Sequence, residues 1–179
     1  MTYISQIPPN SMIASALDRI DYQDAFAIQL KQIQQLPPAK LPPLFFRALP
    51  KWFGVLIFIR ERIASWLGLK TAAGIDIGRQ LKDFTGEPGQ SIALFHILGN
   101  SENEILSGED DQHLDFRLSF FSTPQAEGTE IMLATTVQMN NWIGKLYFLP
   151  VGVVHRLIVP LILKRMARLV EQEYEKKGV

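Results

Sequence analysis

The stretch from Glu104 to Met166 constrains the fold of this chain more than any other part of it. Apolar and polar residues alternate through most of it, in segments separated by turn-forming residues, and a long apolar segment follows. Alternation is typical of antiparallel strands with one buried face, and an apolar segment of this length is typical of a helix. The order predicts an α+β fold in which an antiparallel sheet packs against a long C-terminal helix.

Four strands are expected between residues 92 and 139. The segment 92–98 is apolar at every position except His96, which predicts a strand covered on both sides. Turns are expected at Asn100–Asn103, Gly108–Asp111 and Pro124–Gly128, where glycine, asparagine, aspartate and proline gather. The first of these turns predicts a hairpin that leads into a strand beginning at Glu104.

The two strands that follow show the clearest period of two. In the first, one face is apolar and the other is mostly polar: Leu114, Phe116, Leu118 and Phe120 against His113, Asp115, Arg117 and Ser119. In the second, the two alternating sets are Ile131, Leu133, Thr135, Val137 and Met139 against Glu130, Met132, Ala134, Thr136 and Gln138.

Two helices are predicted. Leu44–Leu67 carries an apolar stripe at spacings of three and four, with a kink or a break at Pro50: Phe45, Leu49, Trp52, Leu56, Ile59, Ile63 and Trp66. The second begins after a cap at Asn140–Asn141, is interrupted at Pro150, and continues over Val151–Glu175. Its inward residues are predicted to be Val154, Leu157, Ile158, Leu161, Ile162, Leu169 and Val170.

The N-terminal part of the chain is less strongly patterned. Residues 1–17 are expected to be a surface segment. Apolar residues at even positions favour a strand over Arg19–Gln29, with a helix as the alternative because Phe26 and Leu30 also fit helical spacing. The proline-rich segment 36–43 then predicts a stiff connector before the helical segment. The length of 179 residues favours one domain over residues 1–179.

Composition excludes several classes of function. The formal net charge is zero, so no basic surplus is present for binding nucleic acid. The absence of cysteine excludes disulfides and thiolate metal sites. No secretory signal pattern opens the sequence, and prolines and charges interrupt the apolar segments, so we expect a cytoplasmic protein with no transmembrane segment.

One polar row could carry chemistry. On a strand, His113, Asp115 and Arg117 project to the same face, about 7 Å apart along the chain. A carboxylate beside an imidazole raises its basicity, and an arginine can hold an anionic group, so a general base with an anion clamp is one interpretation. The other is a solvated surface row. A two-carboxylate metal site is the weakest of the three interpretations, since no second histidine stands at ligand spacing.

The other two histidines lie in apolar surroundings. His96 alternates with apolar neighbours and is predicted to be a core histidine. His155 and Arg156 stand near the start of the terminal helix, either at the mouth of a cavity or at the wet edge of the helix. No phosphate-binding loop, nucleophile elbow or metalloprotease motif is present in the sequence.

The segments GEDDQHLDFRLSF, TTVQMNNWIGKLYFLPV and HRLIVPLIL resemble an uncharacterised bacterial family, as do DYQDAF and the segment LFFRALPKWFGVLIFIRERIASWLGLK. Members occur alone or fused behind an NAD(P)-binding, epimerase-like domain. The family is similar to the START-like (SRPBCC) helix-grip superfamily, which implies a curved antiparallel sheet around a C-terminal helix with a cavity between them. It implies no catalytic residues and no cofactor, and any redox partner would be a separate NAD(P)-dependent oxidoreductase.

Three functions follow as hypotheses. The first is a binding domain for an apolar small molecule or lipid, with a cavity between a sheet face (Phe116, Leu118, Leu133 and Val137) and a helix face (Leu157 and Leu161). His113, Asp115, Arg117 and His155 would supply its polar groups. The second is an enzyme of the cyclase or hydratase type with His113 or His155 as acid and base. The third is an interaction module with a filled core, as a homodimer or a partner of an oxidoreductase.

Overall fold

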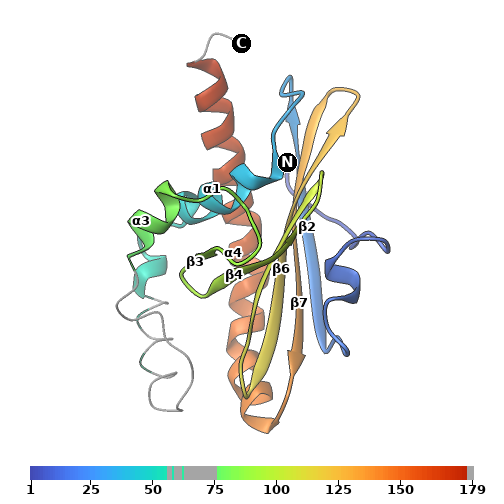
Figure 1. Ribbon diagram of the computed structural model, residues 1–179, viewed down its shortest axis with the longest axis vertical. Coiled ribbons are helices and arrows are strands. Elements are labelled where there is room, and N and C mark those ends of the chain that lie inside the picture. The colour runs from blue at the N-terminus through green and yellow to red at the C-terminus, as the bar shows by residue number, and fades with distance from the viewer. Residues whose placement is uncertain (56–57, 59–61, 63–75, 177–179) are drawn as a thin grey trace.

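The computed structural model describes residues 1–55, 58, 62 and 76–176, and its central feature is one antiparallel sheet (Figure 1). Within the described residues the sheet has seven strands in the order β1-β2-β7-β6-β5-β4-β3. The strands are β1 (Tyr3–Ile4), β2 (Tyr22–Lys31), β3 (Ser91–Ile92), β4 (Phe95–Asn100), β5 (Glu104–Asp110), β6 (Leu114–Gln125) and β7 (Gly128–Met139). The predicted α+β class is confirmed, and the predicted early strand is β2 rather than a helix.

The long hairpin of β6 and β7 forms the middle of the sheet. Its register runs from Leu114 opposite Met139 to Gln125 opposite Gly128. Gly128 has a φ of 141°, and a Cβ there would lie 2.0 Å from the carbonyl oxygen of Leu30. Glycine is therefore required where this hairpin turns beside β2.

The alternation predicted for these two strands is confirmed, because each strand divides its side chains between two cores. The residues of β6 and β7 in the larger core, which includes α4, are Leu118, Phe120, Ile131 and Leu133. Those in the smaller core, on the opposite face of the sheet, are Phe121, Met132 and Ala134. The sheet is thus covered on both faces.

Helix α4 (Trp142–Glu175) lies across the larger core and closes the fold (Figure 1). The predicted cap is confirmed, since the Asn141 side chain accepts a hydrogen bond from the backbone N–H of Gly144. Four buried residues of the helix repeat every four positions toward the sheet: Ile158, Ile162, Met166 and Val170. By length and composition, α4 is the helix in the described part of the chain that could cross a membrane.

The predicted interruption at Pro150 is wrong, because α4 continues through Pro150 and Pro160. A proline inside a helix leaves the carbonyl four residues earlier without its donor. Those carbonyls belong to Leu146 and Arg156, and both residues are on the exposed side of α4. Water can satisfy them there, and packing against the sheet stabilises the helix as a whole.

The N-terminal segment lies at the surface, as predicted, and it also covers the second face of the sheet. Ile13, in the short helix η1 (Ile13–Ser15), is fully buried against the smaller core. The buried carboxylate of Glu104 holds this segment in place. It accepts hydrogen bonds from the backbone N–H groups of Met12 and Ile13, and from the Ser119 hydroxyl.

The first helical segment breaks at Pro50, as predicted, and the described residues beyond it at 53–55, 58 and 62 are helical. After the short helix η2 (Pro38–Lys40), α1 spans Leu41–Ala48 and ends before Pro50, as expected of a proline break. Trp52, predicted to be inward, is half exposed. Four members of the predicted stripe lie outside the described residues: Leu56, Ile59, Ile63 and Trp66. A further short helix, α3 (Ile77–Lys82), is capped by Asp76.

Two other local predictions are wrong. The segment 92–98 is a hairpin rather than one covered strand, and Ala93 turns it with a φ of 54°. His96 is consequently half exposed instead of buried in the core, with its Nε2 2.9 Å from Glu109 Oε2. The turn predicted at Gly108–Asp111 lies later, because β5 continues to Asp110. A Cβ at Gly108 would lie 2.4 Å from the carbonyl oxygen of Phe116, so glycine is needed here for β5 and β6 to pair closely.

Candidate functional site

The candidate site is centred on Asp24, a carboxylate that β2 places toward α4. Its neighbours at the same alternating positions, Phe26 and Ile28, belong to the larger core. Asp24 lies opposite Thr135 of β7, and its side chain is only 10% exposed. From α4, His155 reaches across to both strands. Three elements therefore bring polar groups into a mostly apolar layer.

The hydrogen bonds of the site converge on one oxygen of Asp24. His155 Nδ1 lies 2.9 Å from Asp24 Oδ2, and the Tyr22 hydroxyl donates to the same oxygen. His155 Nε2 lies 3.4 Å from the Thr135 hydroxyl. With its proton on Nδ1, the imidazole donates to the carboxylate and keeps its Nε2 lone pair toward Thr135.

The second oxygen of Asp24 is different. Oδ1 is buried and has no hydrogen-bond partner among the described residues. Leaving such an oxygen unpaired costs about 1–3 kcal/mol, and more for a charged group. Groups of this kind are few in folded proteins, and each is a candidate for a functional role.

Tyr22 is held as a neutral hydrogen-bond donor. Burial, and then the hydrogen bond to Asp24, raise its pKa from 10.0 to about 12. The Arg156 guanidinium lies 5.3 Å from the centre of the Tyr22 ring and lowers the pKa of Tyr22, but by less than these two effects raise it. Phe148 packs on the same ring with its centroid 4.8 Å away. The phenol is therefore fixed between an aromatic ring, a cation and a carboxylate.

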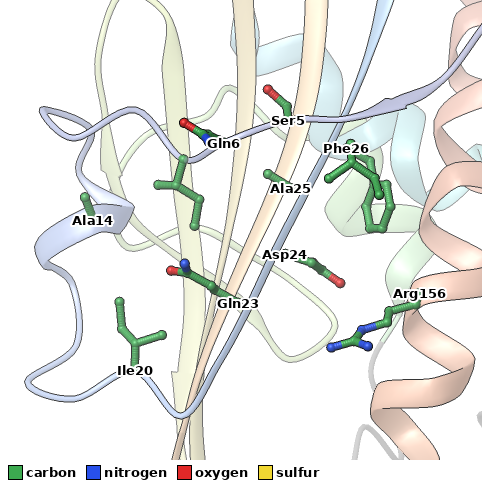
Figure 2. Close-up of a pocket in the computed structure, with 11 residues that line it drawn as sticks. Ser5, Gln6, Ala14, Ile20, Gln23, Asp24, Ala25, Phe26 and Arg156 are labelled. Atoms are coloured by element: carbon green, nitrogen blue, oxygen red, sulfur yellow. The ribbon is translucent and has the colours of Figure 1, made fainter.

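An open hollow of about 710 Å³ lies beside this cluster, at the exposed part of β2 (Figure 2). Asp24 and Arg156 supply its charged groups, and in Figure 2 the guanidinium extends from α4 toward the Asp24 side of the hollow. The rest of its wall is apolar or uncharged: Ile4, Ser5, Gln6, Ile7, Ala14, Ile20, Gln23, Ala25 and Phe26.

A second open hollow, of about 510 Å³, borders the first half of α4. Arg156 borders both hollows, and Tyr22 borders the second. Its other lining residues are mostly apolar: Met139, Lys145, Phe148, Leu149, Gly152, Val153 and Leu157. Arg156 thus joins the two hollows, with Asp24 in the wall of the first and Tyr22 in the wall of the second.

The polar row predicted on β6 is divided by the structure. His113 and Asp115 bind the connection to α4: the Asn141 amide lies 2.9 Å from His113 Nδ1, and the Asn140 amide donates to Asp115 Oδ2. Arg117 is buried, and its Nη1 lies 2.6 Å from Asp110 Oδ1. Of the predicted polar site residues, only His155 lies in the Asp24 cluster.

The predicted apolar site residues also separate. Leu133 and Val137 are buried, and Phe116 packs on Phe95 with ring centroids 5.4 Å apart. Leu157 is 74% exposed and lies at the rim of the second hollow. The prediction that Leu157 points inward is wrong, as it is for Val154 and Leu161, which are also exposed. The helix instead turns Ile158 and Ile162 toward the sheet, one residue further along.

Three residues of this cluster were not identified in the sequence: Tyr22, Asp24 and Thr135. Arg156 was considered together with His155 as a residue at the mouth of a cavity. A signal for two of the three was present, because Asp24 interrupts an apolar strand face and Thr135 stands between Leu133 and Val137. A polar residue at an inward position is the pattern to search for. Among the described residues, no group of three or more histidine and acidic side chains could hold a metal ion.

The fold and this cluster define a small α+β protein in which an open antiparallel sheet packs against a long C-terminal helix, consistent with a helix-grip arrangement. A family model described as "Protein of unknown function (DUF2867)" matches residues 16–162, and the chain belongs to this family. Searches of curated proteins and of solved structures each found no significant match.

Proposed function

We propose that this protein binds a small amphipathic molecule at the junction of the two hollows. The observation that carries the proposal is that the Asp24 carboxylate, which His155 orients, and the Arg156 guanidinium line the same hollow. Small-molecule sites typically combine an apolar lining with a few convergent polar groups, in a volume of about 300–1,000 Å³. Both hollows have volumes in this range.

The lining predicts the chemistry of the ligand. An apolar body would lie on Ile7, Ile20 and Phe26 in the first hollow. An anionic or acceptor group would face Arg156, and a donor group would face the Asp24 carboxylate. A fatty acid derivative or an apolar carboxylic acid with a hydroxyl group fits this description.

The resemblance to START-like helix-grip domains supports a lipid-like ligand against the terminal helix. In this chain the hollows lie at the edge of the sheet–helix interface. Leu118 and Leu133 are part of a packed core with Ile162 and Met166 in the middle of that interface. A separate NAD(P)-dependent oxidoreductase as a partner stays a prediction of the resemblance.

Native mass spectrometry of the purified protein, followed by solvent extraction, tests the proposal. We expect a bound molecule that is lost on denaturation. Asp24→Asn and Arg156→Gln should each reduce its occupancy, because each alters a charged group at the hollow. Arg19→Gln is the matched control, since Arg19 is exposed and pairs with Asp21 outside the cluster. Equal occupancy in all variants would refute this site.

Acid–base catalysis of the cyclase or hydratase type is the second candidate, and a specific observation favours it. His155 is oriented by Asp24 through a 2.9 Å contact, as a general base is oriented by a carboxylate. If the extracted compound is converted on incubation with the protein, His155→Gln should abolish the conversion. His113→Gln is the matched control, because His113 binds the α4 connection instead. Conversion that survives His155→Gln would refute this role.

A further inference from the structure

The outward side of α4 carries a continuous apolar surface, which we call the apolar strip. Its residues recur every three or four positions and are all exposed: Trp142, Leu146, Leu149, Val153, Leu157 and Leu161. They span 20 positions, a length of about 30 Å along a helix. Leu149 and Leu157 are 68% and 74% exposed. Contiguous apolar surfaces of this kind mark sites of protein or membrane interaction.

The charges on α4 are all of one sign over most of its length. From Trp142 to Val170 the helix contains no aspartate or glutamate, and the first acidic residue is Glu171. Its cations are all exposed: Lys145, Arg156, Lys164, Arg165 and Arg168. On a helix of 3.6 residues per turn, Lys145 lies beside the strip and Lys164 continues it past Leu161. The Arg156 guanidinium is turned toward Tyr22 and Asp24 instead. The nearby acid Asp21 is already paired with Arg19.

This charge distribution selects one kind of partner. If a second copy of the chain docked on the strip, it would bring cations against cations, with no acid on the strip to pair with them. A surface of anionic lipids complements both features, because headgroups attract lysine and arginine while the acyl boundary accepts apolar side chains. Trp142 at one end fits the usual place of tryptophan at a membrane interface.

We propose that α4 docks this protein on anionic membrane surfaces, with the apolar strip in the interface and the flanking cations on the headgroups. The helix would lie along the surface rather than cross it, because its opposite side packs on the sheet through Ile158, Ile162 and Met166. The second hollow would then open at the lipid surface, since Leu149, Val153 and Leu157 line both the hollow and the strip. The docking surface does not depend on the ligand proposed above.

Sedimentation with lipid vesicles tests the proposal. The intact protein should bind vesicles of equimolar phosphatidylcholine and phosphatidylglycerol, and binding should weaken as salt is raised. It should bind vesicles of phosphatidylcholine alone at least tenfold more weakly, since each basic residue near an anionic surface contributes about fivefold in affinity. Absence of binding to the anionic vesicles would overturn the proposal.

Variants outside both hollows separate this surface from the ligand site. The double variant Trp142→Gln with Leu146→Gln should lower the partition coefficient about tenfold, because it removes two apolar groups from the interface. Lys164→Gln should lower it about fivefold. Leu98→Gln and Lys31→Gln are the matched controls, as both residues are exposed on the sheet away from α4. Loss of binding in the controls to the same extent would overturn the proposal.

Two further measurements test whether the variants are folded and whether the protein is a monomer. Circular dichroism should show the variants to be folded, since their side chains are exposed. Light scattering of the intact protein should show a monomer. A dimer that the Trp142 and Leu146 variant dissociates would overturn the proposal in favour of a second copy of the chain on the strip.

Discussion

Two threonines of β7 should respond in opposite ways to the same substitution. Thr129 and Thr136 are both buried, and replacement by valine removes only a hydroxyl group from each. The Thr129 hydroxyl donates to the carbonyl oxygen of Ile33 at 2.6 Å, whereas the Thr136 hydroxyl has no partner among the described residues. We expect Thr136→Val to stabilise the protein and Thr129→Val to destabilise it.

The magnitudes follow from the hydrogen-bond account. A buried hydroxyl without a partner costs about 1–3 kcal/mol, so its removal at Thr136 should raise the free energy of unfolding by about 1 kcal/mol. At Thr129 the hydrogen bond is lost and the Ile33 carbonyl is left unpaired, so the free energy of unfolding should fall by about 2 kcal/mol. The two variants should differ by about 3 kcal/mol, or roughly 6–12 °C in Tm for a chain of this size.

Urea denaturation followed by far-ultraviolet circular dichroism measures both values, and equal m-values would show that the unfolded states are comparable. The decisive result is the sign at Thr136. If Thr136→Val lowers the urea midpoint as far as Thr129→Val does, the Thr136 hydroxyl has a hydrogen-bond partner and its removal is not stabilising. Arg117 lies directly opposite Thr136 with its Nε also buried and unpartnered in the described structure, so a molecule bridging these two groups would give that result.

Three further predictions rest on single contacts. Gly144→Ala should destabilise the protein by about 2–4 kcal/mol in urea denaturation, because its Cβ would lie 2.0 Å from the His113 carbonyl oxygen; a loss under about 0.5 kcal/mol would contradict this. Glu104→Ala should accelerate amide hydrogen exchange at residues 12–13, because the Glu104 carboxylate accepts hydrogen bonds from both of these N–H groups. Unchanged exchange would show that other contacts hold that segment. Tyr22→Phe should remove part of the loss of stability at alkaline pH. The Tyr22 hydroxyl has a pKa of about 12 in the folded protein and of 10.0 in the unfolded chain. Its contribution to stability is therefore complete below pH 10.0 and falls as the pH rises toward 12. An unchanged slope in that range would contradict the assignment.

The alternating strands and the helix cap were predictable because they depend on neighbours in the chain. A period of two assigns Leu118 and Leu133 to one face of the sheet wherever the strand is placed. An asparagine before an apolar segment caps the helix because its side-chain oxygen accepts a hydrogen bond from a backbone N–H a few residues later. The strand alternation and the Asn141 cap were both confirmed. Local patterns failed where apolar residues were too dense to choose a face, as in the segment 92–98 and on α4.

The candidate site could not be predicted because its members are far apart in the chain. Asp24 and His155 are separated by 131 positions, and no periodicity relates them. Their meeting depends on β2 pairing with β7 and on α4 crossing both strands, which together place a carboxylate, a hydroxyl and an imidazole in contact.

Backbone geometry and nearby side chains fix the class of the fold, the faces of the central strands and the beginning of the terminal helix, so the sequence predicts each of these. The buried side of α4 depends instead on long-range packing. Apolar residues occupy both of these sides of the helix, so its own periodicity does not distinguish the side that packs on Leu133 from the side that carries Leu157. Packing against the sheet determines the buried side, because it covers Ile158 and Ile162 and leaves the apolar strip exposed.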